Sequence, residues 1–397
     1  MDALPIDAIE DDRAWLAAAF SAAVESVHPR VALAHRLRSI PEPTRLGRRR
    51  LIAIGKAAGA FARAFVERYP VDDGIVIAPP DAPASVAGLI DAPGDHPVPN
   101  AASFAAGLRL WDFIGEVNAD DVYIVLLTGG ASALCVVPIA GVTLEQKRQA
   151  TLQAMRTGAS IAQLNQLRRQ LSQIKGGGLE RRLAPARCIT LAISDVQGDD
   201  PAVIGSGPTV SSAASLANYR VIATLDDALR AVRAYAAAAG IGIIDLGRTL
   251  YGSVESEAAR ITAEIHRCRA AAQFGDRPRL VLAGGEPVIT VQGDGWGGRA
   301  QHLALAIGAK LEGLEGVTVL VGGTDGIDGP TPAAGAFADG ATVERLRARG
   351  VSAADILARC DSHSALAAVG DSWVTGRTDT NVADIAMALV RPARMWP

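Results

Sequence analysis

The chain has 397 residues, of which 49% are hydrophobic and only 4% aromatic, and it carries a formal net charge of -3. This length exceeds what one ordinary hydrophobic core holds, so we expect two domains. The charge balance excludes a basic surface for nucleic acid, and no apolar run approaches the roughly 20 residues that a membrane helix needs. The four cysteines are far apart and form no CxxC pair, which argues against a zinc or disulfide framework and favours a reducing cytoplasm.

Short apolar runs alternate with helical patterns along the chain. The predicted strands are residues 51–54, 74–78, 122–127, 189–193, 280–283 and 317–321. The predicted helices are residues 11–37, 57–69, 144–163, 226–239 and 253–272. This alternation is typical of parallel sheets with helices on both faces, so we predict the α/β class. A break in the pattern at residues 275–278 separates the predicted domains, 1–274 and 275–397.

Glycines, acids, hydroxyls and a lysine follow the predicted strands directly. Gly55-Lys56 ends the first strand, and the turn at residues 128–132 (TGGAS) ends the third. Asp195 closely follows the fourth strand, and Asp325 closely follows the last. Because the carboxyl ends of parallel strands lie at one edge of a sheet, we expect these groups to border a ligand crevice.

Three of these stretches suit an anion. Lys56 lies at a strand-to-helix turn, where helix amides and a mobile ammonium favour negative charge, although taken alone it fits a surface lysine better. The turn at residues 128–132 offers free backbone amides and hydroxyls, with a simple tight turn as the alternative. Lys175 precedes three glycines and follows Arg168 and Arg169; a helix C-cap accounts for the glycines but not for the clustered charge.

Acidic residues could bind a metal at two places. Asp195, Asp199 and Asp200 would suit Mg²⁺, which takes a few carboxylates together with phosphate oxygens. Asp325 and Asp328 repeat this chemistry in the second half of the chain. Acidic turns without a ligand are the alternative for each stretch.

Residues 293–298 (GDGWGG) match the GxGxxG pattern of dinucleotide sites, after the apolar residues 288–291 and before a predicted helix near Ala300. A glycine-rich turn explains the pattern as well, and the neighbouring Arg299 would suit a phosphate. The chain has no HExxH zinc motif and no GxSxG elbow, so a zinc enzyme and a serine hydrolase are not indicated.

In their order along the chain, these stretches resemble the type 2 glycerate kinases, whose C-terminal region is the MOFRL domain. The resemblance covers nearly the whole chain. Its motifs are residues 55–57 (GKA), 96–99 (HPVP), 128–134 (TGGASAL), 171–177 (LSQIKGG), 194–200 (SDVQGDD), 206–209 (SGPT), 284–286 (GGE), 297–299 (GGR), 323–331 (GTDGIDGPT) and 380–382 (TNV).

The resemblance implies transfer of the γ-phosphoryl group of ATP to the 2-hydroxyl of D-glycerate, with ATP and Mg²⁺ required. It implies a Rossmann-like N-terminal domain and a smaller C-terminal α/β (MOFRL) domain around a cleft. It assigns catalysis to Lys56, Asp195, Arg299 and Asp325, and the metal to Asp195 and Asp199. It assigns substrate or phosphate binding to Gly129, Gly130, Ser132, Lys175, Ser206, Gly207, Thr324, Arg377 and Asn381. The expected partners are ATP and a small hydroxy acid, without nucleic acid or membrane, in a cytoplasmic monomer or homodimer.

The sequence departs from the family pattern at several positions. Ala300 and His302 replace an Asn and a Glu, and Arg377 and Asp379 replace a Pro and a Gly. These changes leave the hydroxy acid open. They also keep two alternatives open: an NAD(P)H-dependent hydroxypyruvate reductase and a non-catalytic binder of a phosphorylated metabolite.

Overall fold

The computed structural model describes residues 11–37, 46–82, 86–157, 161–273 and 276–392. The chain forms two compact units of nearly equal length. The parallel-sheet unit comprises His28–Thr224 and Asp379–Asn381, and the mixed-sheet unit comprises Met1–Val27, Leu225–Thr378 and Val382–Pro397. No helix in the described ranges is long and apolar enough to cross a bilayer.

The parallel-sheet unit contains six strands in the order β3-β2-β1-β4-β5-β6, and every neighbouring pair is parallel. The strands are β1 (Arg49–Ile54), β2 (Asp73–Ile77), β3 (Ile90–Asp91), β4 (Val122–Leu127), β5 (Arg187–Ile193) and β6 (Tyr219–Ala223). This is the Rossmann strand order. From β1 the chain adds strands first on one side of the sheet and then, from β4 onwards, on the other side. All residues of β1 and β4 are buried, as expected for central strands covered on both faces.

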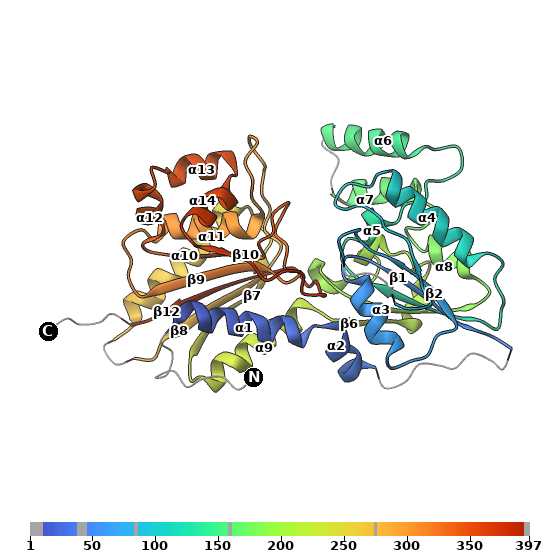
Figure 1. Ribbon diagram of the computed structural model, residues 1–397, viewed down its shortest axis with the longest axis horizontal. Coiled ribbons are helices and arrows are strands. Elements are labelled where there is room, and N and C mark those ends of the chain that lie inside the picture. Colours follow the sequence, from blue (N-terminus) through green and yellow to red (C-terminus); the bar gives the residue numbers. More distant parts are fainter. Residues whose placement is uncertain (1–10, 38–45, 83–85, 158–160, 274–275, 393–397) are drawn as a thin grey trace. The chain divides into compact units, whose positions relative to one another are not determined.

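Helices cover both faces of this sheet. The helices of this unit are α2 (Pro29–Arg36), α3 (Ala58–Val66), α4 (Ala101–Ile114), α5 (Ala131–Leu134), α6 (Leu144–Arg156), α7 (Ile161–Gln170) and α8 (Gly178–Leu183), with 3₁₀ turns η2 (Gln197–Asp199), η3 (Ile204–Ser206) and η4 (Ala213–Asn218). Figure 1 shows α3 on one side of the strands and α4, α5 and α8 on the other. Residues from α4, α5 and α8 share one apolar cluster with alternate residues of the strands.

The mixed-sheet unit also has six strands, in the order β11-β10-β9-β12-β8-β7. They are β7 (Gly242–Leu250), β8 (Arg279–Gly285), β9 (Val317–Gly323), β10 (Gly335–Asp339), β11 (Ser372–Trp373) and β12 (Asp384–Val390). Only β7 and β8 pair in parallel; the other neighbouring pairs are antiparallel. The α/β prediction is confirmed, but the second sheet is mixed rather than parallel.

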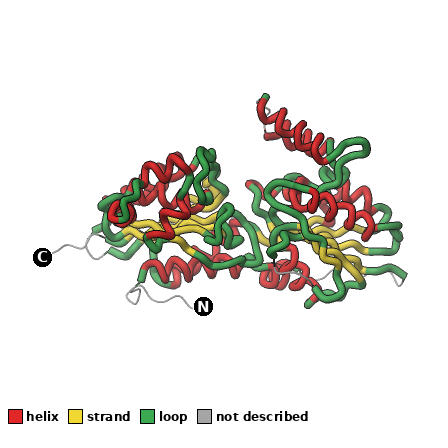
Figure 2. The backbone as a smooth tube through the Cα atoms, turned by 45° about the horizontal axis from the view of Figure 1, so that its top comes forward, coloured by secondary structure: helices red, strands yellow, loops and turns green. Residues whose placement is uncertain are grey.

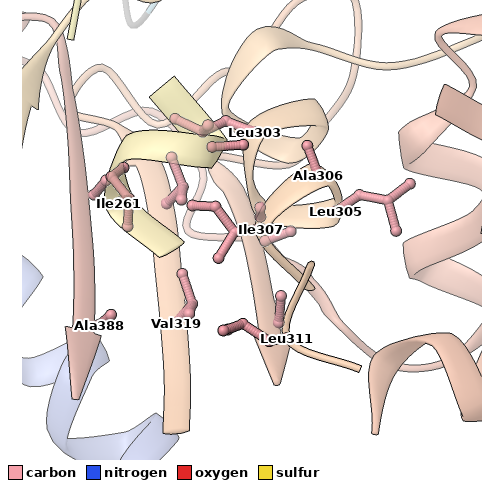
Figure 3. Packing of buried hydrophobic residues seen from close by; sticks show 14 of the residues in the cluster. Ile261, Leu303, Leu305, Ala306, Ile307, Leu311, Val319 and Ala388 are labelled. Atoms are coloured by element: carbon pink, nitrogen blue, oxygen red, sulfur yellow. The ribbon is translucent and has the colours of Figure 1, made fainter. Parts of the chain in front are cut away.

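The helices of this unit are α1 (Asp12–Ser26), α9 (Leu225–Ala238), α10 (Val254–Ala271), α11 (Arg299–Lys310), α12 (Thr342–Ala348), α13 (Ala353–Arg359) and α14 (Ser362–Ala368). They form layers on both sides of the strands (Figure 2). Figure 3 shows one layer of the core, in which Ile261 of α10 and Leu303 and Ile307 of α11 lie over Val319 of β9 and Ala388 of β12. Every residue of β12 is buried, which fixes this strand at the centre of the sheet.

Several predicted boundaries differ from the structure. The helix expected over residues 11–37 ends at Ser26, and a second helix begins at Pro29, a residue that favours the first turn of a helix. The helix expected over 144–163 ends at Arg156, and residues 158–160 lie outside the described part.

The boundary between the compact units also differs from the expected domain boundary. Contacts divide the chain between Thr224 and Leu225, because β7 pairs with β8 and α9 packs on both strands. The mixed-sheet unit is therefore nearly as long as the parallel-sheet unit. Residues 274 and 275, at the expected boundary, lie outside the described residues. The division into 1–274 and 275–397 stays a prediction about sequence domains.

Candidate active site

Two turns lie side by side where the strand order of the parallel sheet reverses. The amide of Lys56 donates to the carbonyl of Gly129 at 2.8 Å, and the amide of Ala57 donates to the Thr128 hydroxyl at 3.1 Å. A Cβ on Gly55 would lie 2.0 Å from Thr128 Oγ1, so only glycine allows this approach. The turn after β1 is therefore hydrogen-bonded to the turn after β4, and Lys56 is held between them.

Asp195, Asn381 and Gly129 meet beside these turns. The Asn381 amide donates to Oδ2 of Asp195 at 3.0 Å. A Cβ on Gly129 would lie 1.9 Å from Asp195 Oδ2 and 2.3 Å from Asn381 Nδ2. Asp195 follows β5 and is half-buried, whereas Asn381 comes from the three-residue segment Asp379–Asn381 near the C-terminus. The missing side chain at Gly129 thus makes room for this polar pair.

A methyl group at Gly129 should displace the pair with little effect on the fold. We expect Gly129→Ala to lower the activity proposed below by about tenfold or more, because the added carbon lies where Asp195 Oδ2 lies now. Steady-state kinetics and the melting temperature Tm measure the two effects. Gly242→Ala is the matched control, since a Cβ there has only an ordinary contact at 3.7 Å. Equal kinetics in both variants would contradict a role for the pair.

Gly130 brings His96 and Lys56 together. Its φ of 82° lies in the left-handed region, and an added Cβ would be 2.9 Å from His96 Cδ2 and 3.0 Å from Lys56 Cγ. The sequence places His96 in a loop motif but assigns it no role. The structure places it beside the lysine at the mouth of the turn.

Asp379 explains one departure from the family pattern. Its φ is 63°, a conformation in which glycine is the usual residue and Asp one of the better tolerated alternatives. Its carboxylate pairs with Arg63 of α3 at 3.2 Å. Both side chains are about one-third exposed, so the pair adds little stability, but it anchors the segment that carries Asn381.

The Lys175 turn is tied to the Ser206–Gly207 loop. The amides of Gly176 and Gly177 donate to the carbonyls of Ser206 and Gly207, at 3.0 and 2.7 Å. Gly205, at the start of this loop, lies against Ala131, since an added Cβ would be 3.4 Å from the Ala131 Cβ. Contacts through this loop therefore connect Lys175 with the turn that contains Ser132, which is half-buried.

Arg299 belongs to the mixed-sheet unit, where two acids already engage it. It begins α11, and its guanidinium donates to both carboxylate oxygens of Asp384, at 2.6 and 3.3 Å, and to Glu286. Burial raises the pKa of Asp384 to about 7, although Arg299 opposes the shift. The two carboxylates raise the pKa of Arg299 despite its burial. Glu286 stands in a family motif that gives it no role, and Asp384 carries no sequence signal.

Asp328 caps the same helix. Its carboxylate accepts from the amides of Ala300 and Gln301, at 3.1 and 2.8 Å, and from the Gln301 side chain at 3.0 Å. Burial nevertheless raises its pKa. The sequence suggests Asp328 as a candidate metal residue; in the structure it satisfies helix N-terminal amides instead.

Removing this cap should destabilise the mixed-sheet unit. We expect Asp328→Ala to lower the free energy of unfolding by about 1–3 kcal/mol, because buried donors on Ala300 and Gln301 lose their acceptor. Thermal unfolding measures the loss. Asp294→Ala, at an exposed carboxylate, is the control and should leave Tm unchanged. A Tm equal to wild type in the Asp328 variant would show that the cap contributes nothing.

Thr324, Asp325 and Arg377 also lie in the mixed-sheet unit. The Thr324 hydroxyl is buried, donates to the Ala383 carbonyl at 2.7 Å and accepts from the Val382 amide at 2.8 Å, so its side chain serves the fold. Asp325 is half-buried and accepts from the Ile327 amide at 3.2 Å. The Thr378 amide donates to the Asp325 carbonyl at 3.3 Å, which links the loop of Asp325 to the segment of Arg377.

The GxGxxG stretch is not part of a strand–turn–helix unit. Between β8 and the motif the chain forms only an isolated bridge at Val288, so no strand leads directly into the glycines. A Cβ on Gly295 would lie 2.2 Å from the Arg359 carbonyl, and one on Gly298 would lie 2.2 Å from Asp328 Cγ. These glycines therefore allow close approach within the protein, and the motif loses its support as a dinucleotide site.

The departures in α11 are core positions. Ala300 is fully buried and belongs to the apolar cluster, and His302 is 4% exposed. Burial lowers the pKa of His302, which favours the neutral imidazole. Their side chains are taken up by the interior of the helix layer.

The acidic side chains of the structure supply only part of the ligands that Mg²⁺ needs. Within the described ranges, no three His, Cys, Asp or Glu side chains gather closely enough to hold a metal by themselves. A magnesium ion bound through phosphate oxygens needs only one or two carboxylates. Asp195 and Asp199, the predicted metal residues, follow β5 and are both half-buried.

The predicted site residues therefore fall into two groups. In the parallel-sheet unit, direct contacts join Lys56, Gly129, Gly130, Asp195 and Asn381, and backbone contacts link Lys175 with Ser206 and Gly207. Arg299, Thr324, Asp325 and Arg377 belong to the other unit. His96, Arg63 and Asp379 are additions from the structure.

Comparison with known proteins agrees with this architecture. A family described as a domain of unknown function (DUF4147) matches residues 15–236, and the MOFRL family matches residues 279–384. D-glycerate 2-kinase of Thermotoga maritima is 33% identical over 86% of this chain and 90% of that protein. A protein of Agrobacterium vitis named "Putative hydroxypyruvate reductase" is 34% identical over 94% of this chain and 93% of its own. A crystal structure of glycerate kinase from Thermotoga maritima superposes with a TM-score of 0.81 at 30% identity, covering 94% and 98% of the two chains.

Proposed function

Because the chain belongs to the glycerate kinase family that joins a DUF4147 domain to a MOFRL domain, we propose that it transfers the γ-phosphoryl group of ATP to the 2-hydroxyl of D-glycerate. The observation that carries this proposal is the similarity to D-glycerate 2-kinase over most of both chains. The reaction yields ADP and 2-phosphoglycerate. We place the protein in the cytoplasm as a monomer or homodimer, with ATP and glycerate as its partners.

The turns of the parallel-sheet unit supply what phosphoryl transfer needs. The reaction requires positioned cations and donors more than covalent chemistry. Lys56 would contact the transferred group, since its amide and its stem are held between the turns after β1 and β4. Asp195, oriented by Asn381, would accept the proton of the attacking hydroxyl or bind the metal. Gly129, Gly130 and Ser132 would offer backbone and hydroxyl donors to phosphate oxygens.

Mg²⁺ would be held by Asp195 and Asp199 together with the nucleotide. Bound there, the ion would neutralise charge on the phosphates during transfer. Among the mixed-sheet residues, we retain Arg299 for the anionic substrate and Asp325 for catalysis. Arg299 would then exchange an acid partner for the substrate carboxylate or phosphoryl group, since Glu286 and Asp384 engage it at present.

The reductase alternative rests on the names of some relatives. Its one sequence motif, GxGxxG, lacks the preceding strand that a dinucleotide site requires. The binder alternative rests on departures from the family pattern. Asp379 adopts the conformation of the glycine it replaces, and Ala300 and His302 are core residues, so these three do not require loss of catalysis.

Product analysis tests the function directly. Purified protein is incubated with Mg²⁺-ATP and D-glycerate, ADP is measured by a coupled assay, and the position of the phosphate is identified by ³¹P NMR. We expect glycerate-dependent ADP and 2-phosphoglycerate. Parallel incubations with L-glycerate and with NADH plus hydroxypyruvate test specificity and the reductase. Oxidation of NADH without 2-phosphoglycerate would replace the proposal by the reductase, and no turnover with any substrate would favour the binder.

A further inference from the structure

The chain contains only four lysines, and two of them, Lys147 and Lys175, are buried in the parallel-sheet unit. Lys147 lies in the first turn of α6 and is 7% exposed; Lys175 follows α7 and is 6% exposed. The Nζ atom of Lys147 is fully buried and has no hydrogen-bond partner among the described residues. Buried ammonium groups are rare unless an acid or an anion compensates them.

Other cations lie near both lysines. Arg168, in the last turn of α7, repels the charge of both, and Lys147 repels the charge of Lys175. Burial and this repulsion lower the pKa of Lys147 to about 8 and that of Lys175 to about 7. Three positive groups therefore lie within range of one another.

No carboxylate in the described part of the chain compensates them. The one nearby group that could become negative is the Cys135 thiol, and burial raises its pKa to about 12. It is therefore neutral under physiological conditions. Lys147 also lies at the positive end of a helix, where a cation is unfavourable. The arrangement is electrostatically incomplete without a negative charge.

We propose that Lys147, Lys175 and Arg168 form a binding site for a phosphate group. The cluster combines two point charges with one planar guanidinium, which suits a multiply charged oxyanion better than a single carboxylate. The phosphate could belong to a nucleotide or be free inorganic phosphate, and the chemistry of the site is the same for both. The proposal rests on charge and burial alone and does not depend on the kinase activity. The sequence places Arg168 near Lys175 in a cluster of charge but does not single out Lys147.

Calorimetric titration with inorganic phosphate at pH 7.5, at constant ionic strength, tests the site. We expect Lys147→Met and Lys175→Met each to weaken phosphate binding by about tenfold or more, since each loses a charge-assisted contact. Lys310→Met, at an exposed lysine of α11, is the matched control and should bind as wild type does. Unchanged affinity in the two buried variants, or loss of equal size in the control, would overturn the proposal.

A second measurement uses the unaltered protein. With lysine labelled by ¹³C at Cε, the four lysines are resolved by NMR and assigned from the single variants. Phosphate should raise the pKa of Lys147 and Lys175 towards the ordinary value of a lysine. It should leave the NMR signal of Lys310 unmoved. Shifts confined to Lys56 would overturn the proposal.

Separate additions of ADP and of adenosine identify the source of the phosphate. If ADP shifts the buried lysines and adenosine does not, the site takes the phosphates of the nucleotide. If inorganic phosphate alone shifts them, it takes a free phosphate. Either result supports the site, and failure of every phosphate compound to shift Lys147 or Lys175 rejects it. Because no turnover is measured, the outcome is independent of whether glycerate is phosphorylated.

Discussion

Replacing Lys56 by methionine should lower kcat for glycerate phosphorylation by roughly 10²–10³-fold. This is the effect of removing one preorganised hydrogen-bond donor that stabilises charge in the transition state. Methionine keeps the length of the apolar stem, and the backbone bond from residue 56 to Gly129 does not involve the side chain. The turn should therefore keep its shape while the ammonium is lost. The expected change falls on kcat more than on KM, because charge on the transferred group develops in the transition state.

Steady-state kinetics with saturating Mg²⁺-ATP separates the two parameters. Lys310→Met removes an exposed lysine from α11 and should leave both unchanged. If the Lys56 variant keeps its kcat and loses only affinity for one substrate, Lys56 stabilises the ground state and the transition state of that substrate equally. Lys56 is then not catalytic. If both kinetic parameters match wild type, the turn after β1 is not where phosphoryl transfer occurs.

The sequence predicts those features of the structure that depend on residues close together along the chain. The strand at Val122–Leu127 is predicted to the residue, because a central parallel strand is apolar throughout. The polar residues at its carboxyl end, and Asp195 after β5, are also predicted from their position. β12 (DIAMALV) is not predicted, since its alanines, methionine and leucine favour a helix as much as a strand, and a short apolar run does not separate the two.

Other features depend on contacts that only the folded chain makes. Lys147 stands in the polar stretch Glu145-Gln146-Lys147-Arg148, which is typical of an exposed helix turn. Its burial results from contacts that only the folded chain makes. Asp384 is distant in sequence from Arg299, its partner. The Arg63–Asp379 pair likewise joins residues from opposite ends of the chain. Spacing rules describe neighbours along one element and cannot find such pairs.

Replacing Lys175 by methionine should stabilise the protein at low pH in phosphate-free buffer. The pKa of Lys175 is lowered from its ordinary value of 10.5 to about 7 in the folded protein. Between these values the unfolded chain binds more protons than the native one, so the free energy of unfolding of wild type rises as the pH rises through this window. Below about pH 7 the lysine is charged in both states, and the full cost of its burial is present.

The stability difference should therefore be largest near pH 6 and should narrow towards pH 10. We expect the methionine variant to be more stable by about 2–4 kcal/mol at pH 6, less than the whole pKa shift implies, because Lys147 and Arg168 relax when the charge is removed. For units of this size, that corresponds to a Tm higher by roughly 5–15 °C. Lys310→Met should show no such dependence on pH. If the Lys175 variant is less stable than wild type at pH 6, the ammonium has a partner that compensates its charge. Addition of phosphate should reduce the difference by stabilising wild type alone, which connects the energetic cost of the buried lysines to the ligand they are proposed to bind.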